Sequence, residues 1–167
     1  MDQRKVNMLA REYCDVADPK IRFKPVILSH HMLAGLKEGQ EKMSKSDPDS
    51  AIFMEDTPED VKRKIKQSFC PPGIVEGNPC LDWMKHIVFG KFGQVTIRRK
   101  PENGGDKIYT DFTELEIDFK SGALHPADLK AALTESINII LQPVRDHFAS
   151  GEPKKLLEAV KSYRITR

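Results

Sequence analysis

One short apolar run limits what this chain can fold into by itself. Residues 26–28, Val-Ile-Leu, follow Pro25 and end in a polar stretch, which is the pattern of a buried strand in a parallel sheet. An α/β domain needs several such strands with helices on both faces, but the only companion is the short apolar piece 51–54. The first third of the chain therefore predicts the end of a larger α/β domain.

The remainder of the sequence predicts helices and one hairpin. Apolar residues recur at helical spacing in 3–13, 57–69, 79–88, 113–122, 125–148 and from 151 onward. Pro143 is expected to kink or split the longest helix, because proline lacks a backbone N–H. Two short strands, at 95–97 and near Ile108, flank a Pro-Glu-Asn-Gly-Gly-Asp loop and predict a β-hairpin. The predicted fold class is mainly α with a small β component.

A cluster of prolines and glycines marks the predicted domain boundary. Its members are Pro71, Pro72, Gly73, Gly77 and Pro79. Such residues punctuate secondary structure, so we place the boundary there. The expected domains are residues 1–70, which contain the strand and a polar loop, and residues 71–167, which form a helical domain with the hairpin.

Composition narrows the class of protein without identifying its activity. The chain has 167 residues, of which 39% are hydrophobic, enough for an ordered core. Charged residues make up 31%, yet the formal net charge is only +2. The overall charge therefore gives no nucleic-acid signature, and any contact with RNA must come from local patches.

Cysteine and histidine spacing predicts no metal site and no disulfide framework. The three cysteines, Cys14, Cys70 and Cys80, are widely spaced and odd in number. His30 and His31 are adjacent, and adjacent histidines rarely converge on one ion. We therefore predict a reduced, cytoplasmic protein. No apolar run approaches the roughly 20 residues of a membrane span, so no membrane partner is expected.

The polar loop "EGQEKMSKSDPDS", residues 38–50, contains the most chemically suggestive side chains. Lys42 and Lys45 carry ammonium groups on long flexible stems, and Ser44 and Ser46 add hydroxyl donors. A loop of this kind can close over a polyphosphate and neutralise charge on its oxygens. Lysine and serine are also ordinary residues of solvated loops, and spacing alone favours that plainer interpretation.

Several motifs, which occur in a fixed order along the chain, favour the phosphate-binding interpretation of the loop. They are "DQRKVNMLARE" (2–12), "PVILSHHMLAGL" (25–36), "KMSKSDPDSAIF" (42–53), "KIKQSFCPPGIVEGNP" (64–79), "GGDKIYTDFTELEIDF" (104–119) and "LHPADLK" (124–130). Together they resemble tyrosyl-tRNA synthetases of the archaeal and eukaryotic type, class I enzymes whose second signature is "KMSKS". Tryptophanyl enzymes are a more distant match. The resemblance implies the C-terminal end of a Rossmann-like catalytic domain, followed by a helical anticodon-binding domain.

The resemblance implies roles for the loop residues. Lys42 and Lys45 would be catalytic, neutralising the ATP phosphates during adenylation, while Ser44 and Ser46 would bind ATP as loop donors. Many archaeal and eukaryotic relatives have serine where this chain has Lys45. The division of labour between the two lysines is therefore left open.

Residues before the loop would contact the two small substrates. Gln3, in "DQRK", falls where the family places a side-chain amide against tyrosine, although by itself it predicts only an exposed first-turn residue. His31, Met32 and Leu33 follow the predicted strand, at the edge where α/β sheets bind ligands. The resemblance places adenine there.

The "HPADLK" segment would recognise the anticodon. His125 and Asp128 have a plain interpretation as first-turn polar residues around Pro126. By resemblance, Asp128 accepts hydrogen bonds from the first anticodon base, a guanine, whose N1–H and N2 groups are donors. Asn103 occupies the hairpin position where relatives carry an aromatic for that base to stack on. The basic run 98–100 would contact phosphates or form a solvated strand edge.

The implied activity is that of a tyrosine–tRNA ligase. It uses ATP, with Mg²⁺ accompanying the nucleotide, to form tyrosyl-adenylate and then charges tRNA(Tyr). The expected whole enzyme is a homodimer or a fused pseudo-dimer, with most of the dimer interface outside this chain. The sequence lacks a "HIGH"-like first signature, so we expect the isolated chain to be inactive. The alternative is a stand-alone, non-catalytic tRNA-binding module derived from a synthetase.

Overall fold

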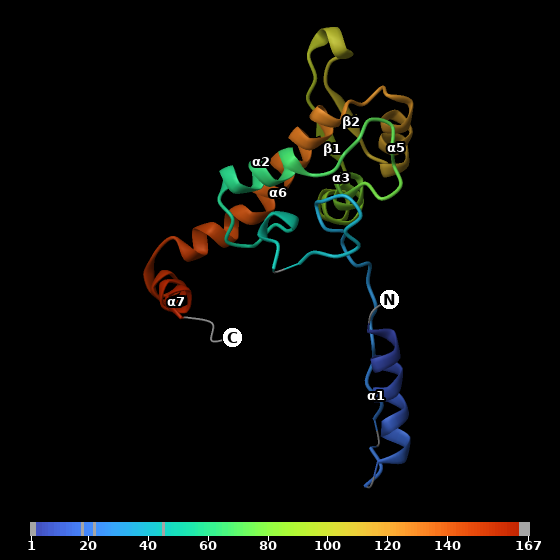
Figure 1. Cartoon of the computed structure of the whole chain (residues 1–167), viewed down its shortest axis with the longest axis vertical. Helices are drawn as coiled ribbons and strands as arrows, with labels where there is room; N and C mark the ends of the chain where they lie inside the picture. The colour runs from blue at the N-terminus through green and yellow to red at the C-terminus, as the bar shows by residue number, and fades with distance from the viewer. Residues whose placement is uncertain (1–2, 18, 22, 45, 164–167) are drawn as a thin grey trace. The chain divides into compact units, whose positions relative to one another are not determined.

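The computed structural model describes residues 3–17, 19–21, 23–44 and 46–163 (Figure 1). The chain separates into an N-terminal unit, residues 1–32, and a main unit, residues 33–167. The expected domain boundary near residue 70 falls inside the main unit, so it stays a prediction about the family's architecture. None of the helices in the described segments has the length and apolar content needed to cross a bilayer.

The N-terminal unit consists of helix α1 and an irregular segment. Helix α1, Arg4–Val16, confirms the helical pattern at 3–13. The predicted buried strand at 26–28 is wrong for this chain: no strand forms there, and Val26 and Leu28 are 87% and 89% exposed. A strand needs a neighbour to pair with, and none lies among the described residues of this unit. Cys14 is the only buried apolar residue that the structure describes in the unit.

The first α-helix of the main unit is α2, Pro58–Gln67. Thr57 and Asp60 form a reciprocal capping box, and Pro58 occupies the first helical position, so the predicted start signal is confirmed. The short 3₁₀ helix η1, Pro48–Ser50, precedes it. The segment 51–54, predicted to be extended, forms no strand.

A second helical stretch follows the proline–glycine cluster. It comprises α3 (Pro79–Trp83), the π-helical η2 (Met84–Phe89) and α4 (Gly90–Phe92). The Asn78 side chain begins it by accepting hydrogen bonds from the backbone N–H groups of Cys80 and Leu81. The predicted helix at 79–88 is therefore present and extends slightly further.

The predicted hairpin is also present. Strands β1, Val95–Ile97, and β2, Lys107–Tyr109, pair antiparallel, with Val95 opposite Tyr109. The short 3₁₀ helix η3, Pro101–Asn103, lies in the loop between them. Gly104 and Gly105 both have positive φ, of 92° and 68°, which glycine adopts without steric cost and which ends η3.

Three helices complete the main unit. They are α5 (Phe112–Ser121), α6 (Pro126–Phe148) and α7 (Gly151–Ser162). Helix α6 continues through Pro143, so the helix is not split, and the alternative expectation of a kink stays a prediction. The side chain of Arg145 holds the segment beyond the proline, because its guanidinium donates to the Asp56 carbonyl at 2.9 Å and to Asn138 Oδ1 at 2.8 Å.

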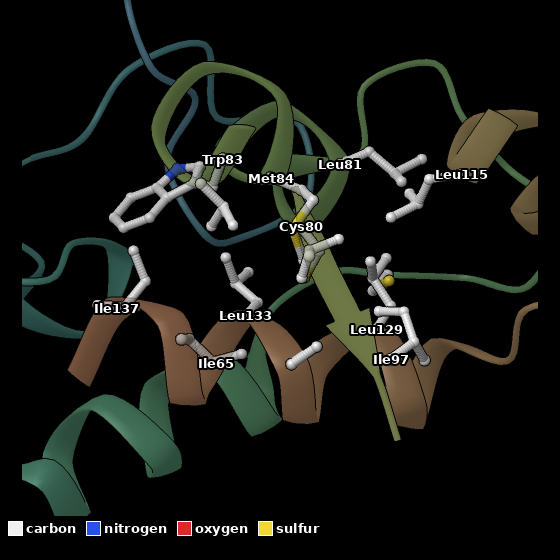
Figure 2. Close-up of a cluster of buried hydrophobic side chains, with 14 of the residues drawn as sticks. Ile65, Cys80, Leu81, Trp83, Met84, Ile97, Leu115, Leu129, Leu133 and Ile137 are labelled. Atoms are coloured by element: carbon white, nitrogen blue, oxygen red, sulfur yellow. The ribbon is translucent and has the colours of Figure 1, made fainter. Parts of the chain in front are cut away.

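The core lies where α2, α3, η2, the hairpin and α6 meet. Figure 2 shows Leu133 and Ile137 of α6 facing Ile65 of α2 and the ring of Trp83. Leu36 is fully buried in the same cluster. The polar loop at 38–50 therefore begins directly from the core of the main unit.

Candidate functional site

The polar loop is closed at its base by Ser50, which is fully buried. The N–H of Leu36 donates to the Ser50 carbonyl at 2.9 Å. The Ser50 hydroxyl donates to the Asp47 carbonyl at 2.7 Å and accepts from the N–H of Ser44 at 3.2 Å. Ser50 thus makes hydrogen bonds to Leu36, just before the loop, and to Ser44 and Asp47 within it. These bonds hold the two ends of the loop together.

Two ion pairs hold the loop against neighbouring residues. Lys37 Nζ lies 2.6 Å from Asp47 Oδ2, and this hydrogen bond lowers the pKa of the Asp47 carboxyl. Arg63 of α2 lies 2.8 Å from Asp49 Oδ1 and joins the loop to the helix.

The side chains predicted to bind ATP lie nearer the tip. Lys42 and Ser46 are exposed, and Ser44 is half-buried. The hydroxyl oxygens of Ser44 and Ser46 lie 2.8 Å apart, so the structure brings these two together. Lys45, the other predicted catalytic lysine, lies outside the described residues.

The N-terminal unit brings together three of the predicted small-substrate residues. Gln3, His31 and Met32 line one open pocket of about 610 Å³, between the first turn of α1 and the segment 28–32. Gln3 lines this space, and its side chain makes no capping hydrogen bond to α1. Leu33 begins the main unit and is not part of this pocket.

The "HPADLK" segment forms the start of α6. His125 is the N-cap, and its Nδ1 accepts a hydrogen bond from the N–H of Ala127 at 3.1 Å. Its ring is exposed, whereas Asp128, in the first turn, is half-buried. The plain capping interpretation of this segment therefore holds geometrically, and Asp128 remains partly exposed beside the cap.

Arg99 connects the hairpin loop to the turn before His125. Its Nε donates to the Gly105 carbonyl at 2.9 Å, and its Nη1 donates to the Ala123 carbonyl at 3.0 Å. Each acceptor is two residues from a predicted anticodon residue, Asn103 or His125. One guanidinium therefore holds both predicted anticodon segments at the same end of the main unit.

A buried hydroxyl fixes the hairpin to α5. Tyr109 is fully buried, and its hydroxyl donates to Asp118 Oδ2 at 2.7 Å, as does Lys107 Nζ at the same distance. Burial and the neighbouring carboxylate raise the pKa of Tyr109 to about 12. The hydrogen bonds from Lys107 and Tyr109 lower the pKa of Asp118.

Comparison with known proteins assigns the chain to a family. The family model for class I tRNA synthetases (W and Y) matches residues 1–142. The chain belongs to this family. The helical main unit with its hairpin, and the "KMSKS" loop that begins from its core, are thus parts of a class I synthetase.

Curated relatives of this synthetase chain are tyrosine–tRNA ligases. Cytoplasmic tyrosine–tRNA ligases 2 and 1 of Arabidopsis thaliana are 58% and 57% identical to it over its whole length, which is 22% and 43% of theirs. The tyrosine–tRNA ligase of Thermococcus sibiricus is 44% identical and also matches the whole chain. The chain spans half or less of the length of these relatives.

Solved structures of tyrosyl-tRNA synthetases share the fold. The Pyrococcus horikoshii enzyme, solved with L-tyrosine, superposes with a TM-score of 0.85 at 38% identity over 95% of this chain and 49% of its own. The Leishmania major enzyme, solved with tyrosinol, gives 0.84 at 49% identity over 99% of this chain and 26% of its own. The predicted fold class is confirmed by these matches and by the helices and hairpin.

Sequence reasoning missed two structural residues of this synthetase chain. In the sequence Arg99 is only part of a basic run, and nothing in that run indicates that its guanidinium bridges two loops. Lys64 is one of several lysines in the sequence of α2, yet its Nζ lies 2.6 Å from Asp56 Oδ2 and its side chain is buried. A signal for Lys64 was present, because it falls on the apolar face with Val61 and Ile65.

Proposed function

We propose that this chain is part of a tyrosine–tRNA ligase and carries its "KMSKS" loop and its anticodon-binding domain. The observation that carries the proposal is the identity of 57–58% to two curated tyrosine–tRNA ligases over the whole chain. The proposed reaction has two steps. The tyrosine carboxylate attacks the α-phosphorus of ATP and releases pyrophosphate, and a ribose hydroxyl of tRNA(Tyr) then attacks the adenylate carbonyl and releases AMP.

In the first step, the loop lysines supply positive charge. Lys42 and Lys45 neutralise the phosphate oxygens as pyrophosphate leaves, and Ser44 and Ser46 donate hydrogen bonds to the same groups. The buried base at Ser50 supports this role because it fixes where the loop starts and ends. Mg²⁺ enters with the ATP phosphates and needs no protein ligand in this scheme.

The small substrates are assigned to the residues before the loop. Gln3 contacts tyrosine through its amide, which can both donate and accept. His31, Met32 and Leu33 contact adenine. The pocket lined by Gln3, His31 and Met32 supports this assignment.

The start of α6 is assigned to the anticodon. Asp128 accepts hydrogen bonds from the first anticodon guanine, while His125 and Asn103 flank that base. The Arg99 bridge supports the assignment, because it holds the Asn103 loop and the His125 turn at one end of the main unit. The whole enzyme is proposed to be cytoplasmic, because two of its relatives are named cytoplasmic ligases. It is also proposed to work as a dimer or as a fused double-length chain.

The anticodon role is tested by measuring binding to two anticodon stem–loop RNAs, one with guanine and one with adenine at the first anticodon position. The wild-type chain should prefer guanine by about 10- to 100-fold, the range expected for one good paired contact. Asp128→Ala should reduce this preference to near unity, because the carboxylate acceptor is lost.

A matched control is Glu152→Ala, which removes an exposed acid from the first turn of α7. It changes the net charge equally and should preserve the guanine preference. If Asp128→Ala binds both RNAs with the wild-type ratio, the anticodon assignment is wrong.

A further inference from the structure

Helices α2 and α6 pack side by side (Figure 1). Side chains of both helices line an open groove, which we call the α2–α6 groove. Its volume is about 580 Å³, within the range of small-ligand sites. Three lysines, Lys62, Lys66 and Lys130, line it. Its floor on α6 is small and apolar, formed by Pro126, Ala127 and Ala131.

The basic residues of α2 divide into two groups. Arg63 pairs with Asp49, and Lys64 is buried against Asp56, so both serve the fold. Lys62 and Lys66 are exposed, and within the described residues neither ammonium has an acidic group at ion-pair distance. They are four residues apart, on one face, where like charges repel. The helix dipole favours Lys66 in the last turn but not Lys62 in the middle of the helix.

Lys130 fixes the shape of the groove. Its Nζ donates to the Lys66 carbonyl at 3.0 Å and to the Ser68 carbonyl at 2.7 Å, which ties the end of α2 to α6. The acid that also lines the groove, Glu135, is held by Arg98 with both oxygens at 2.8 Å. The groove therefore has an excess of positive charge, and the two helices that line it are joined by hydrogen bonds.

The groove is continuous with the proposed anticodon site. Pro126 and Ala127, which form part of its floor, lie between His125 and Asp128 in the sequence. An RNA whose anticodon base reaches Asp128 must place neighbouring nucleotides near this turn of α6. Phosphate contacts position an RNA, whereas base contacts give specificity.

We propose that the α2–α6 groove binds the sugar–phosphate backbone of the RNA strand that flanks the anticodon, with Lys62 and Lys66 each contacting a phosphate. This inference rests on the proposed function and adds a second, sequence-independent contact to it. The small apolar floor leaves room for a ribose, and Lys130 keeps the two helices at the required separation.

The test compares the wild-type chain with the double variant Lys62→Gln/Lys66→Gln across a series of salt concentrations. The probes are the guanine and adenine anticodon stem–loop RNAs. Loss of two phosphate contacts should reduce the slope of log affinity against log salt by about 1.4, since single-stranded contacts contribute about 0.7 each. Near 0.1 M salt the affinity should fall roughly tenfold or more. The ratio of guanine to adenine binding should be unchanged.

The control is Lys154→Gln/Lys155→Gln, which removes the same charge from exposed positions on α7. It should leave the salt slope close to wild type. Thermal unfolding of each variant, followed by circular dichroism, confirms that the chains compared are folded. A groove variant whose slope matches that of the α7 control overturns the proposal.

The two proposals fail in different ways. Absence of any guanine preference in the wild-type chain contradicts the anticodon assignment of Asp128, while a changed salt slope in the groove variant still supports the groove. A normal guanine preference with an unchanged slope contradicts the groove alone.

Discussion

At the scale of single residues, the buried hydroxyl of Tyr109 gives the hairpin a pH-dependent hold on α5. Its pKa is raised from 10.0 to about 12 by burial and by the Asp118 carboxylate. A group whose pKa is raised in the folded state stabilises the fold at pH values below the pKa that the group has in the unfolded chain. This stabilisation is lost as the pH rises from 10 toward 12.

We therefore predict a pH-dependent effect of Tyr109→Phe. Near neutral pH, the variant should lower the free energy of unfolding by about 1 kcal/mol, because the hydrogen bond to Asp118 is lost. The gap between wild type and variant should narrow between pH 10 and 12, when urea unfolding is measured at each pH. Tyr163→Phe, at a ring that is 73% exposed, should give a curve parallel to wild type. A gap for Tyr109→Phe that stays constant through this range contradicts the prediction.

The residue-level features that the sequence predicted are local ones. Thr57, Pro58 and Asp60 are neighbours, so their capping pattern is visible without a structure. The contacts of Arg99 reach Gly105 and Ala123, and Tyr109 reaches Asp118 across the turn into α5. Such partners depend on how the elements fold together, which spacing alone does not determine.

At the scale of elements, a buried ion pair joins α2 to the segment that follows the "KMSKS" loop. The side chains of Lys64 and Asp56 are only 4% and 10% exposed, and their charged atoms are 2.6 Å apart. The same carboxylate accepts from the N–H of Phe53 at 2.9 Å, and the Asp56 carbonyl accepts from Arg145 of α6. The segment 53–56 is thus held by two helices.

We predict that Lys64→Met lowers the free energy of unfolding by about 3 kcal/mol or more, because it leaves the Asp56 carboxylate buried without its partner. Adding Asp56→Asn should recover part of this loss. Arg63→Met is the matched control, since its ion pairs are exposed and should contribute less than about 1 kcal/mol. Urea unfolding of the four chains measures these differences. Equal losses for Lys64→Met and Arg63→Met would exclude a special contribution from the buried pair.

The sequence predicted secondary structure correctly where all the residues that form an element lie in this chain. It failed where a strand needs a neighbouring strand to pair with. The amphipathic helices from α2 onward and the hairpin at 95–109 form from contacts within the main unit, and the structure confirms them. The run 26–28 has the composition of a strand, but hydrogen-bond partners make a strand, and the described residues of its unit supply none. The candidate site residues were assigned from their positions in the family's motifs, and their roles stay predictions.

At the scale of the whole molecule, buried apolar surface is distributed very unevenly between the two units. Among the described residues, every buried apolar side chain except Cys14 belongs to the main unit. The N-terminal unit instead exposes many large apolar side chains, including Leu9, Tyr13 and Phe23. Burial of apolar surface is the main favourable term in folding, so the stability of the chain should reside in residues 33–167.

We therefore predict that a chain beginning at Leu33 unfolds like the whole chain. Its thermal midpoint should lie within about 4 °C of the parent, equivalent to roughly 1 kcal/mol. The fluorescence of Trp83, which is buried and donates to the Ala34 carbonyl at 2.9 Å, reports the transition. A chain beginning at Met43 is the matched control. It lacks the fully buried Leu36 as well as Ala34, so its midpoint should fall by clearly more. If the chain from Leu33 shows no cooperative transition, residues 1–32 contribute to the core in a way that the distribution of buried side chains does not reveal.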